Sequence, residues 1–176
     1  MSLLERVLTL LCPNLKSVVE KSNEPEKMLR QLLLDMRNQL VQVKTQLAIA
    51  IAESHKHQKR SKERMLEAET WSKKAEQAIQ QGNDHAARTA LGHYNEAVKQ
   101  AEYYKQQQQQ QQQLIATMRS ILRQLEAKIS EIETTIDTLT TQKRNVLIQE
   151  RVLGALSSAE KQRERENREH GNNYRQ

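Results

Sequence analysis

The chain has 176 residues, but it contains no phenylalanine, one tryptophan, four glycines and two prolines. Few aromatic residues and few turn formers, with many Gln, Glu, Lys, Arg, Ala and Leu residues, are typical of long helices or coiled coils, and this excludes a thick globular core. The net charge of +6 permits an anionic lipid surface or a nucleic acid as partner, and the single cysteine, Cys12, allows no internal disulfide and fits a reducing compartment.

The first predicted element is a short amphipathic helix over residues 2–11, ended by Cys12-Pro13. Spaced about 100° apart, its residues place one apolar arc on the helix, made of Leu3, Leu4, Val7, Leu8, Leu10 and Leu11. The stretch is shorter than the about 20 residues needed to span a bilayer. Glu5, the absence of a basic leading region and the absence of a small-residue cleavage site argue against a signal peptide. The helix is therefore expected to lie in a membrane interface or to pack on its own protein.

A long helix is predicted over residues 24–81. Asn23 and Glu26 resemble a capping box, and Pro25 suits the first turn of a helix. Apolar residues then recur at coiled-coil spacing, with one four-residue stutter and a weak, polar middle. The predicted seam is Leu29, Leu33, Met36, Leu40, Val43, Leu47, Ile51, Ser54, Gln58, Ser61, Met65, Ala68, Ser72, Ala75 and Ile79.

A turn at residues 82–84 and a second long helix over residues 85–153 follow. Gly82 can take the left-handed position at the end of the first helix, and Asn83 or Asp84 can cap the second. The predicted seam of the second helix is Ala87, Leu91, Tyr94, Val98, Ala101, Ile115, Met118, Leu122, Leu125, Ile129, Ile132, Ile136, Leu139, Val146 and Leu153. A short turn between two long helices makes them antiparallel. The predicted fold is all-α: a long antiparallel coiled-coil hairpin preceded by a short amphipathic helix.

Three segments are expected along the chain. Residues 1–22 form the amphipathic, membrane-contacting helix and a linker, residues 23–154 form the hairpin, and residues 155–176 form a charged, disordered tail. The eight glutamines at 106–113 are expected to continue the second helix with a polar seam, because glutamine is a good helix former; disorder is the alternative.

No enzymatic site and no cofactor are expected. Glycines only at 82, 92, 154 and 171 leave no phosphate-binding loop and no dinucleotide fingerprint. His55 and His57 do not share a helix face, and no Cys/His cluster offers a metal site. The basic segment 56–64 has no aromatic residue for base stacking, so nucleic-acid binding is not expected.

The order of these features over residues 1–153 resembles the family of phage shock protein A and the vesicle-inducing protein in plastids, in the ESCRT-III-like membrane-remodelling superfamily. Residues 23–29 are similar to the family's Asp-Pro-(Glu/Gln)-Lys helix start, with Glu24 where Asp is usual. The expected hairpin tip matches the family pattern at Trp71, Ala75, Ala78, Gly82, Asp84, Ala87, Arg88, Ala90 and Leu91. The glutamine run is not a family feature.

The resemblance implies a peripheral membrane-binding, self-associating scaffold that maintains or remodels membrane under envelope stress. It would act from the cytoplasm on the inner face of the cell membrane, with anionic lipid and further copies of itself as partners. The apolar arc would enter the headgroup boundary, while Arg6 and Lys16 meet lipid phosphates. The predicted membrane-binding residues are Leu3, Leu4, Arg6, Val7, Leu8, Leu11 and Lys16.

The same resemblance implies an alternative role, a regulatory coiled-coil module that binds and inhibits an AAA+ transcriptional activator. Trp71, Arg88 and Tyr94 would then contact the partner, although ordinary packing near the tip explains these residues as well. A generic coiled-coil scaffold is a third possibility.

Overall fold

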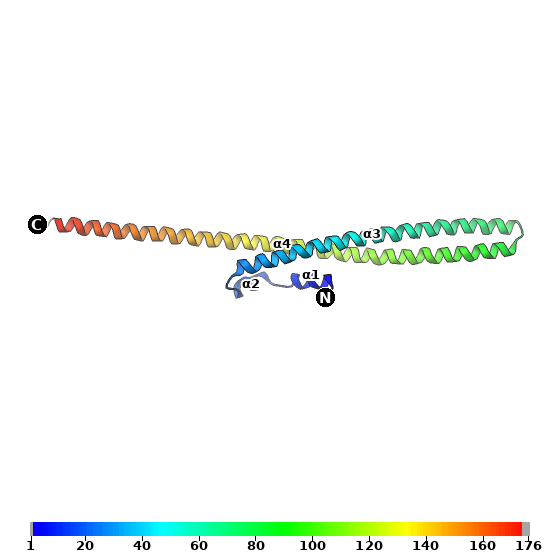
Figure 1. The fold of residues 1–176 in the computed structure, drawn as a ribbon, viewed down its shortest axis with the longest axis horizontal. Coiled ribbons are helices and arrows are strands. Elements are labelled where there is room, and N and C mark those ends of the chain that lie inside the picture. The colour runs from blue at the N-terminus through cyan, green and yellow to red at the C-terminus, as the bar shows by residue number, and fades with distance from the viewer. Residues whose placement is uncertain (1, 174–176) are drawn as a thin grey trace. The chain divides into compact units, whose positions relative to one another are not determined.

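The computed structural model describes the backbone of residues 2–173 and the side chains of residues 2–169. Within that range the chain folds into α1 (Leu3–Leu11), α2 (Leu15–Lys21), α3 (Pro25–Gln80) and α4 (Asp84–Asn173), and no strand occurs. α3 and α4 run side by side in opposite directions (Figure 1). The predicted all-α helical hairpin, preceded by a short amphipathic helix, is confirmed.

The chain divides into two compact units, residues 1–12 with 35–128 and residues 13–34 with 129–176. In the first unit, α1 packs on the paired parts of α3 and α4 that lead to the turn. In the second unit, α2 and the first turns of α3 pack with the later part of α4, and Leu15, Leu29 and Ile132 are buried.

The turn between α3 and α4 is a Schellman ending followed directly by a helix cap. Gly82 has a φ of +69°, a conformation that only glycine adopts without strain. The Asn83 N–H donates to the Ala78 carbonyl oxygen at 2.9 Å, and the Gly82 N–H donates to the Ile79 carbonyl oxygen at 3.0 Å. Asn83 Oδ1 then accepts from the Ala86 N–H at 3.1 Å and caps α4. These bonds satisfy several of the backbone groups that the two helix ends leave free.

The core of the first unit changes in character along the helix pair. The part nearest the turn, which we call the alanine arm, is lined by Ala68, Ala75, Ala78, Ala87, Ala90, Ala97 and Ala101. The part farthest from the turn, which we call the aliphatic arm, is lined by Met36, Val43, Ile115, Met118, Ile121 and Leu125. Small side chains let two helices approach closely, whereas large ones bury more apolar area per residue.

A polar centre separates the two arms. Ser54 is buried there, Ser61 Oγ donates to the Ala101 carbonyl oxygen at 2.9 Å, and the rings of His57 and Tyr104 stack at 6.2 Å. The glutamine run at 106–113 is helical throughout, which confirms that it continues α4.

Several predicted seam residues are exposed instead. In the alanine arm, the large side chains of Met65, Ile79 and Leu91 lie outside the seam, which Ala78, Ala90 and Ala97 occupy. On a straight helix, residues spaced by a strict heptad rotate by about 20° around the helix with each repeat. A seam predicted from such spacing therefore no longer faces the partner helix near the turn.

The end of α4 also differs from the sequence prediction. The predicted helix ended at residue 153, and residues 155–176 were expected to be disordered, but α4 continues to Asn173; residues 174–176 lie outside the described range. This segment is rich in Glu, Arg, Lys and Gln, which are good helix formers, and extending an existing helix requires no new nucleation. All described side chains from 141 to 169 are exposed, including the predicted seam residues Val146 and Leu153. α2 was not predicted, because residues 1–22 were expected to hold one helix and a linker.

Candidate functional site

The first turn of α1 stabilises the helix through its own side chains. Ser2 and Glu5 form a capping box: the Ser2 N–H donates to Glu5 Oε2 at 2.7 Å, and the Glu5 N–H donates to Ser2 Oγ at 3.3 Å. Thr9 Oγ1 donates to the Glu5 carbonyl oxygen at 2.8 Å. The two bonds between Ser2 and Glu5 satisfy backbone donors that a helix start leaves free. Nine residues are nevertheless marginal for an isolated helix in water, so α1 needs a surface to pack on.

The apolar arc of α1 is only partly covered by the protein. Val7 is fully buried, whereas Leu8, the next residue, is 48% exposed. The half-buried members of the arc are Leu3, Leu4, Leu10 and Leu11. The middle of the arc therefore packs on the hairpin, and Leu8, at one edge of the arc, is the member that faces solvent.

α1 lies on a largely polar part of the first unit. Two grooves of about 400 and 660 Å³ lie beside it, with α1 as one wall of each. The residues that form the opposite walls, which we call the α1 bed, are Asp35, Asn38, Gln39, Val41, Gln42, Thr45, Gln46 and Met118. Gln39 Oε1 is buried there without a hydrogen-bond partner. The walls of the grooves that face α1 are thus mainly polar.

Arg6 and Lys16, the two cationic residues predicted to bind lipid, lie on different helices. Arg6 is exposed on α1, beside the apolar arc, and lines both grooves. Lys16 is exposed in the first turn of α2, where its N–H donates to the Asn14 cap at 3.1 Å, and it belongs to the second unit. Arg6 thus shares a helix with the arc, whereas Lys16 lies on another element.

The ring of Trp71 contacts other residues of the hairpin. Its ring stacks on His93 of α4 with centroids 4.4 Å apart, and Lys74 Nζ lies 4.1 Å from its centroid. Tyr94 is half-buried and Arg88 is exposed. Trp71 thus makes its ring contacts within the hairpin, near the tip.

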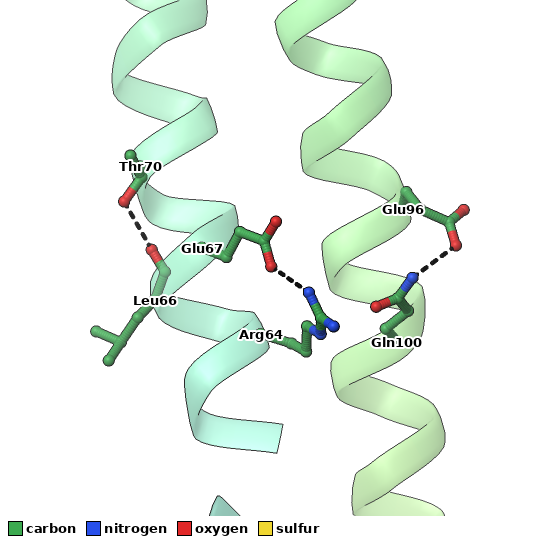
Figure 2. Close-up of polar contacts among 6 residues, drawn as sticks. All are labelled: Arg64, Leu66, Glu67, Thr70, Glu96 and Gln100. Carbon is green, nitrogen blue, oxygen red and sulfur yellow. Dashed lines mark hydrogen bonds and ion pairs between the residues drawn. The ribbon is translucent and has the colours of Figure 1, made fainter. Parts of the chain in front are cut away.

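Polar side chains on the faces of the alanine arm bond within their own helices. Figure 2 shows Arg64 donating to Glu67 and Gln100 donating to Glu96. The hydrogen bond from Arg64 is the main cause that lowers the pKa of the Glu67 carboxyl, supported by the positive charge of the same guanidinium. These bonds stabilise each helix and do not set the pairing of the two helices.

A second apolar surface lies on α4, in a segment that sequence analysis assigned to the hairpin seam. Residues 146–156, which we call the exposed apolar segment, carry six large side chains that are each about half exposed: Val146, Leu147, Ile148, Val152, Leu153 and Leu156. At 100° per residue these side chains point in nearly all directions around the helix. The signal in the sequence was the run of three successive apolar residues at 146–148, which a seam with three- and four-residue spacing does not contain.

Two kinds of site do not occur among the described residues. No helix between residues 2 and 173 combines the length and apolar character needed to cross a membrane. Among the side chains of residues 2–169, no three His, Cys, Asp or Glu residues gather where they could hold a metal ion.

Comparison with known proteins finds a family and several relatives. The model of the PspA/IM30 family matches residues 2–169. The membrane-associated protein Vipp1 of Synechocystis is 34% identical over 162 residues, which are 92% of this chain and 57% of that protein. Vipp1 of Nostoc punctiforme is 32% identical over 154 residues, 88% of this chain and 60% of that protein. The phage shock protein A homolog of Deinococcus radiodurans is 30% identical over 133 residues, 76% of this chain and 60% of that protein. The chain thus matches about 60% of the length of these relatives.

Proposed function

Because this chain belongs to the PspA/IM30 family, we propose that it is a peripheral membrane-binding scaffold that self-associates to maintain or remodel membrane under envelope stress. The proposal includes attachment to anionic lipid on the inner face of the cell membrane and a structural rather than catalytic role. The observation that carries it is the partly covered apolar arc of α1, in which Leu8 at one edge faces solvent, while the exposed Arg6 lies next to the other edge. Relatives that bear the name membrane-associated protein support the same role.

α1 alone binds a bilayer weakly. Each buried apolar side chain contributes about 1.5–3 kcal/mol at most, and ordering the segment and immobilising the chain offset much of that gain. Several copies of α1 on one assembly bind as a multivalent unit, in which each further attachment is effectively intramolecular. Self-association therefore supplies the affinity that a single α1 lacks.

The exposed apolar segment on α4 supports the self-associating part of the proposal. A helix that is apolar on most sides is stable in water only when several neighbours cover it. Residues 146–156 have this character, and within the described part of the chain their large side chains remain about half exposed. In a self-associating scaffold, further copies of the chain cover this segment. The stacking of Trp71 within the hairpin does not favour the alternative role as a regulator of an AAA+ activator.

Leu8 and Thr9 allow a matched test of membrane binding, because they are adjacent and both exposed, with Leu8 on the apolar arc and Thr9 about 100° away on the polar side of α1. Leu8→Glu places a charge where acyl chains would lie, whereas Thr9→Glu adds the same charge to the polar face. In co-flotation with phosphatidylglycerol vesicles, Leu8→Glu is expected to lower the bound fraction about tenfold, in line with the loss of one buried leucine.

Thr9→Glu should float nearly as well as the parent chain, and the parent should bind phosphatidylglycerol vesicles better than neutral phosphatidylcholine vesicles. Equal flotation of Leu8→Glu and the parent would show that α1 serves only as a packing element. The proposed mechanism would then be wrong.

A further inference from the structure

The apolar side chains of α1 can contact either the hairpin or a membrane, but not both at the same time. Val7 is fully buried against the hairpin, and its neighbours on the arc, Leu3 and Leu4, are half-buried there. A helix that lies in a bilayer interface must turn this arc toward the acyl chains. α1 cannot pack Val7 on the hairpin and insert it into lipid at the same time.

The α1 bed has few apolar residues. Of the bed residues only Val41 and Met118 are apolar, and Val41 is 64% exposed even with α1 in place. Gln39 Oε1, in the wall of a groove that α1 also lines, is buried without a hydrogen-bond partner, which is unfavourable for the structure with α1 in place. Two grooves remain beside the helix, and both are lined by Arg6 and Gln42. The docked helix thus buries Val7 completely but leaves open grooves with mainly polar walls beside it.

From these observations we propose that the α1 bed is an intramolecular regulatory site that sequesters α1 from the membrane, with Gln39 keeping the docked state weak enough for lipid to displace it. The inference rests on the proposed membrane-binding role of α1. The occupant is α1 of the same chain, because residues 1–12 lie within the same compact unit as the bed. Lipid binding then shifts a two-state equilibrium between docked and released α1.

Under this mechanism the affinity for lipid depends on residues that never touch lipid. The apparent affinity equals the intrinsic affinity of free α1 reduced by the fraction of chains in which α1 is released. A change in the bed that favours docking weakens lipid binding, and a change that disfavours docking strengthens it. A purely structural role of the bed would give no such opposite pair of effects.

The tightening variant is Gln39→Leu, which removes the unpartnered buried acceptor and adds apolar surface beside α1 without changing charge. Its matched control is Gln77→Leu, the same change at an exposed position of α3 outside the bed. Two readouts apply: hydrogen exchange of the α1 amides without lipid, and fluorescence of a polarity-sensitive dye on Cys12 during titration with phosphatidylglycerol vesicles. Cys12 is the chain's only cysteine and is exposed at the end of α1.

Gln39→Leu is expected to slow exchange of the α1 amides at least threefold and to raise the lipid concentration for half-maximal binding at least threefold. Gln77→Leu should change neither. The loosening variant is Gln42→Lys, which places a second cation beside Arg6 in both grooves. It should speed exchange and lower the half-maximal lipid concentration, relative to the control Thr70→Lys, which adds the same charge at an exposed site outside the bed.

The proposal would be overturned if Gln39→Leu slowed exchange of the α1 amides but left lipid binding unchanged. It would also be overturned if the α1 amides of the parent exchanged as fast as those of an unfolded chain. The proposed function fails by a different result, namely Leu8→Glu binding vesicles like the parent. Loss of binding in Leu8→Glu together with no effect of Gln39→Leu and Gln42→Lys would leave membrane binding in place and reject the regulatory site alone.

Discussion

The alanine arm and the aliphatic arm of the hairpin use the same pair of helices in different ways. In the aliphatic arm, side chains such as Met36 and Leu125 are fully buried and each contributes about 1.5–3 kcal/mol of hydrophobic stabilisation. In the alanine arm each buried residue removes little more than one methyl group from water, worth about 0.8 kcal/mol. Stability is therefore concentrated far from the turn, and the alanine arm contributes close helix approach.

The polar centre makes the two arms partly independent. Gln39 aside, the buried polar atoms without a partner include His57 Nδ1, which lies in this centre. A region with little apolar burial and polar seam residues opens at lower free energy than the aliphatic core. We expect the alanine arm to exchange its amides by local opening while the aliphatic arm remains folded.

The largest expected effect is a cavity in the aliphatic arm. Leu125→Ala should lower the free energy of unfolding by about 2–5 kcal/mol, because Leu125 is 0% exposed and its removal leaves a void. Urea denaturation followed by circular dichroism measures this change. The matched control is Leu114→Ala on the same helix, where the side chain is 36% exposed and the loss should be much smaller. Equal losses would contradict the assignment of the core to this arm.

A smaller effect is expected from overpacking the alanine arm. Ala90→Leu introduces three carbon atoms at a position that is 5% exposed, and it should lower the free energy of unfolding by about 1–3 kcal/mol. Thr89→Leu places the same side chain at the adjacent, exposed position and serves as control. If Ala90→Leu were as stable as Thr89→Leu, the helices would not approach closely near the turn.

The smallest expected effect is electrostatic and concerns the surface of the alanine arm. Hydrogen bonding to Arg64 lowers the pKa of Glu67 in the folded state from its ordinary value of 4.5. The stabilisation is therefore present above that value and is lost as the pH falls through the lowered folded pKa. Because Glu67 is exposed, solvent screens the pair and the effect is small.

Glu67→Gln provides the comparison for this prediction. The difference in urea midpoint between the parent and Glu67→Gln should be largest near neutral pH and should shrink toward zero on acidification. High salt should reduce it as well. A difference that is unchanged at acid pH would mean that the Arg64 contact does not stabilise the folded state.

The fold was largely predictable because long helices follow from local information. The start at Pro25, the turn at Gly82 and the uninterrupted glutamine run all depend on residues close in sequence, and the structure confirms each of them. The position of the seam was less predictable near the turn. Ile79 and Leu91 are more apolar than Ala78 and Ala90, yet the alanines are buried, because the separation of the two helices decides which side chains fit between them.

The sequence by itself determined that α1 is an amphipathic helix, since the period of its leucines and the Ser2–Glu5 cap are local properties. It also determined the family resemblance, which the match over residues 2–169 confirms. Only the tertiary structure decided that Val7 is buried on the hairpin while Leu8 faces solvent, and that the apolar residues at 146–156 have no cover within the described chain. The physical reason is that burying an apolar arc lowers the free energy regardless of which surface covers it. The pattern of apolar residues therefore shows that the arc will be covered, but it does not identify the covering surface.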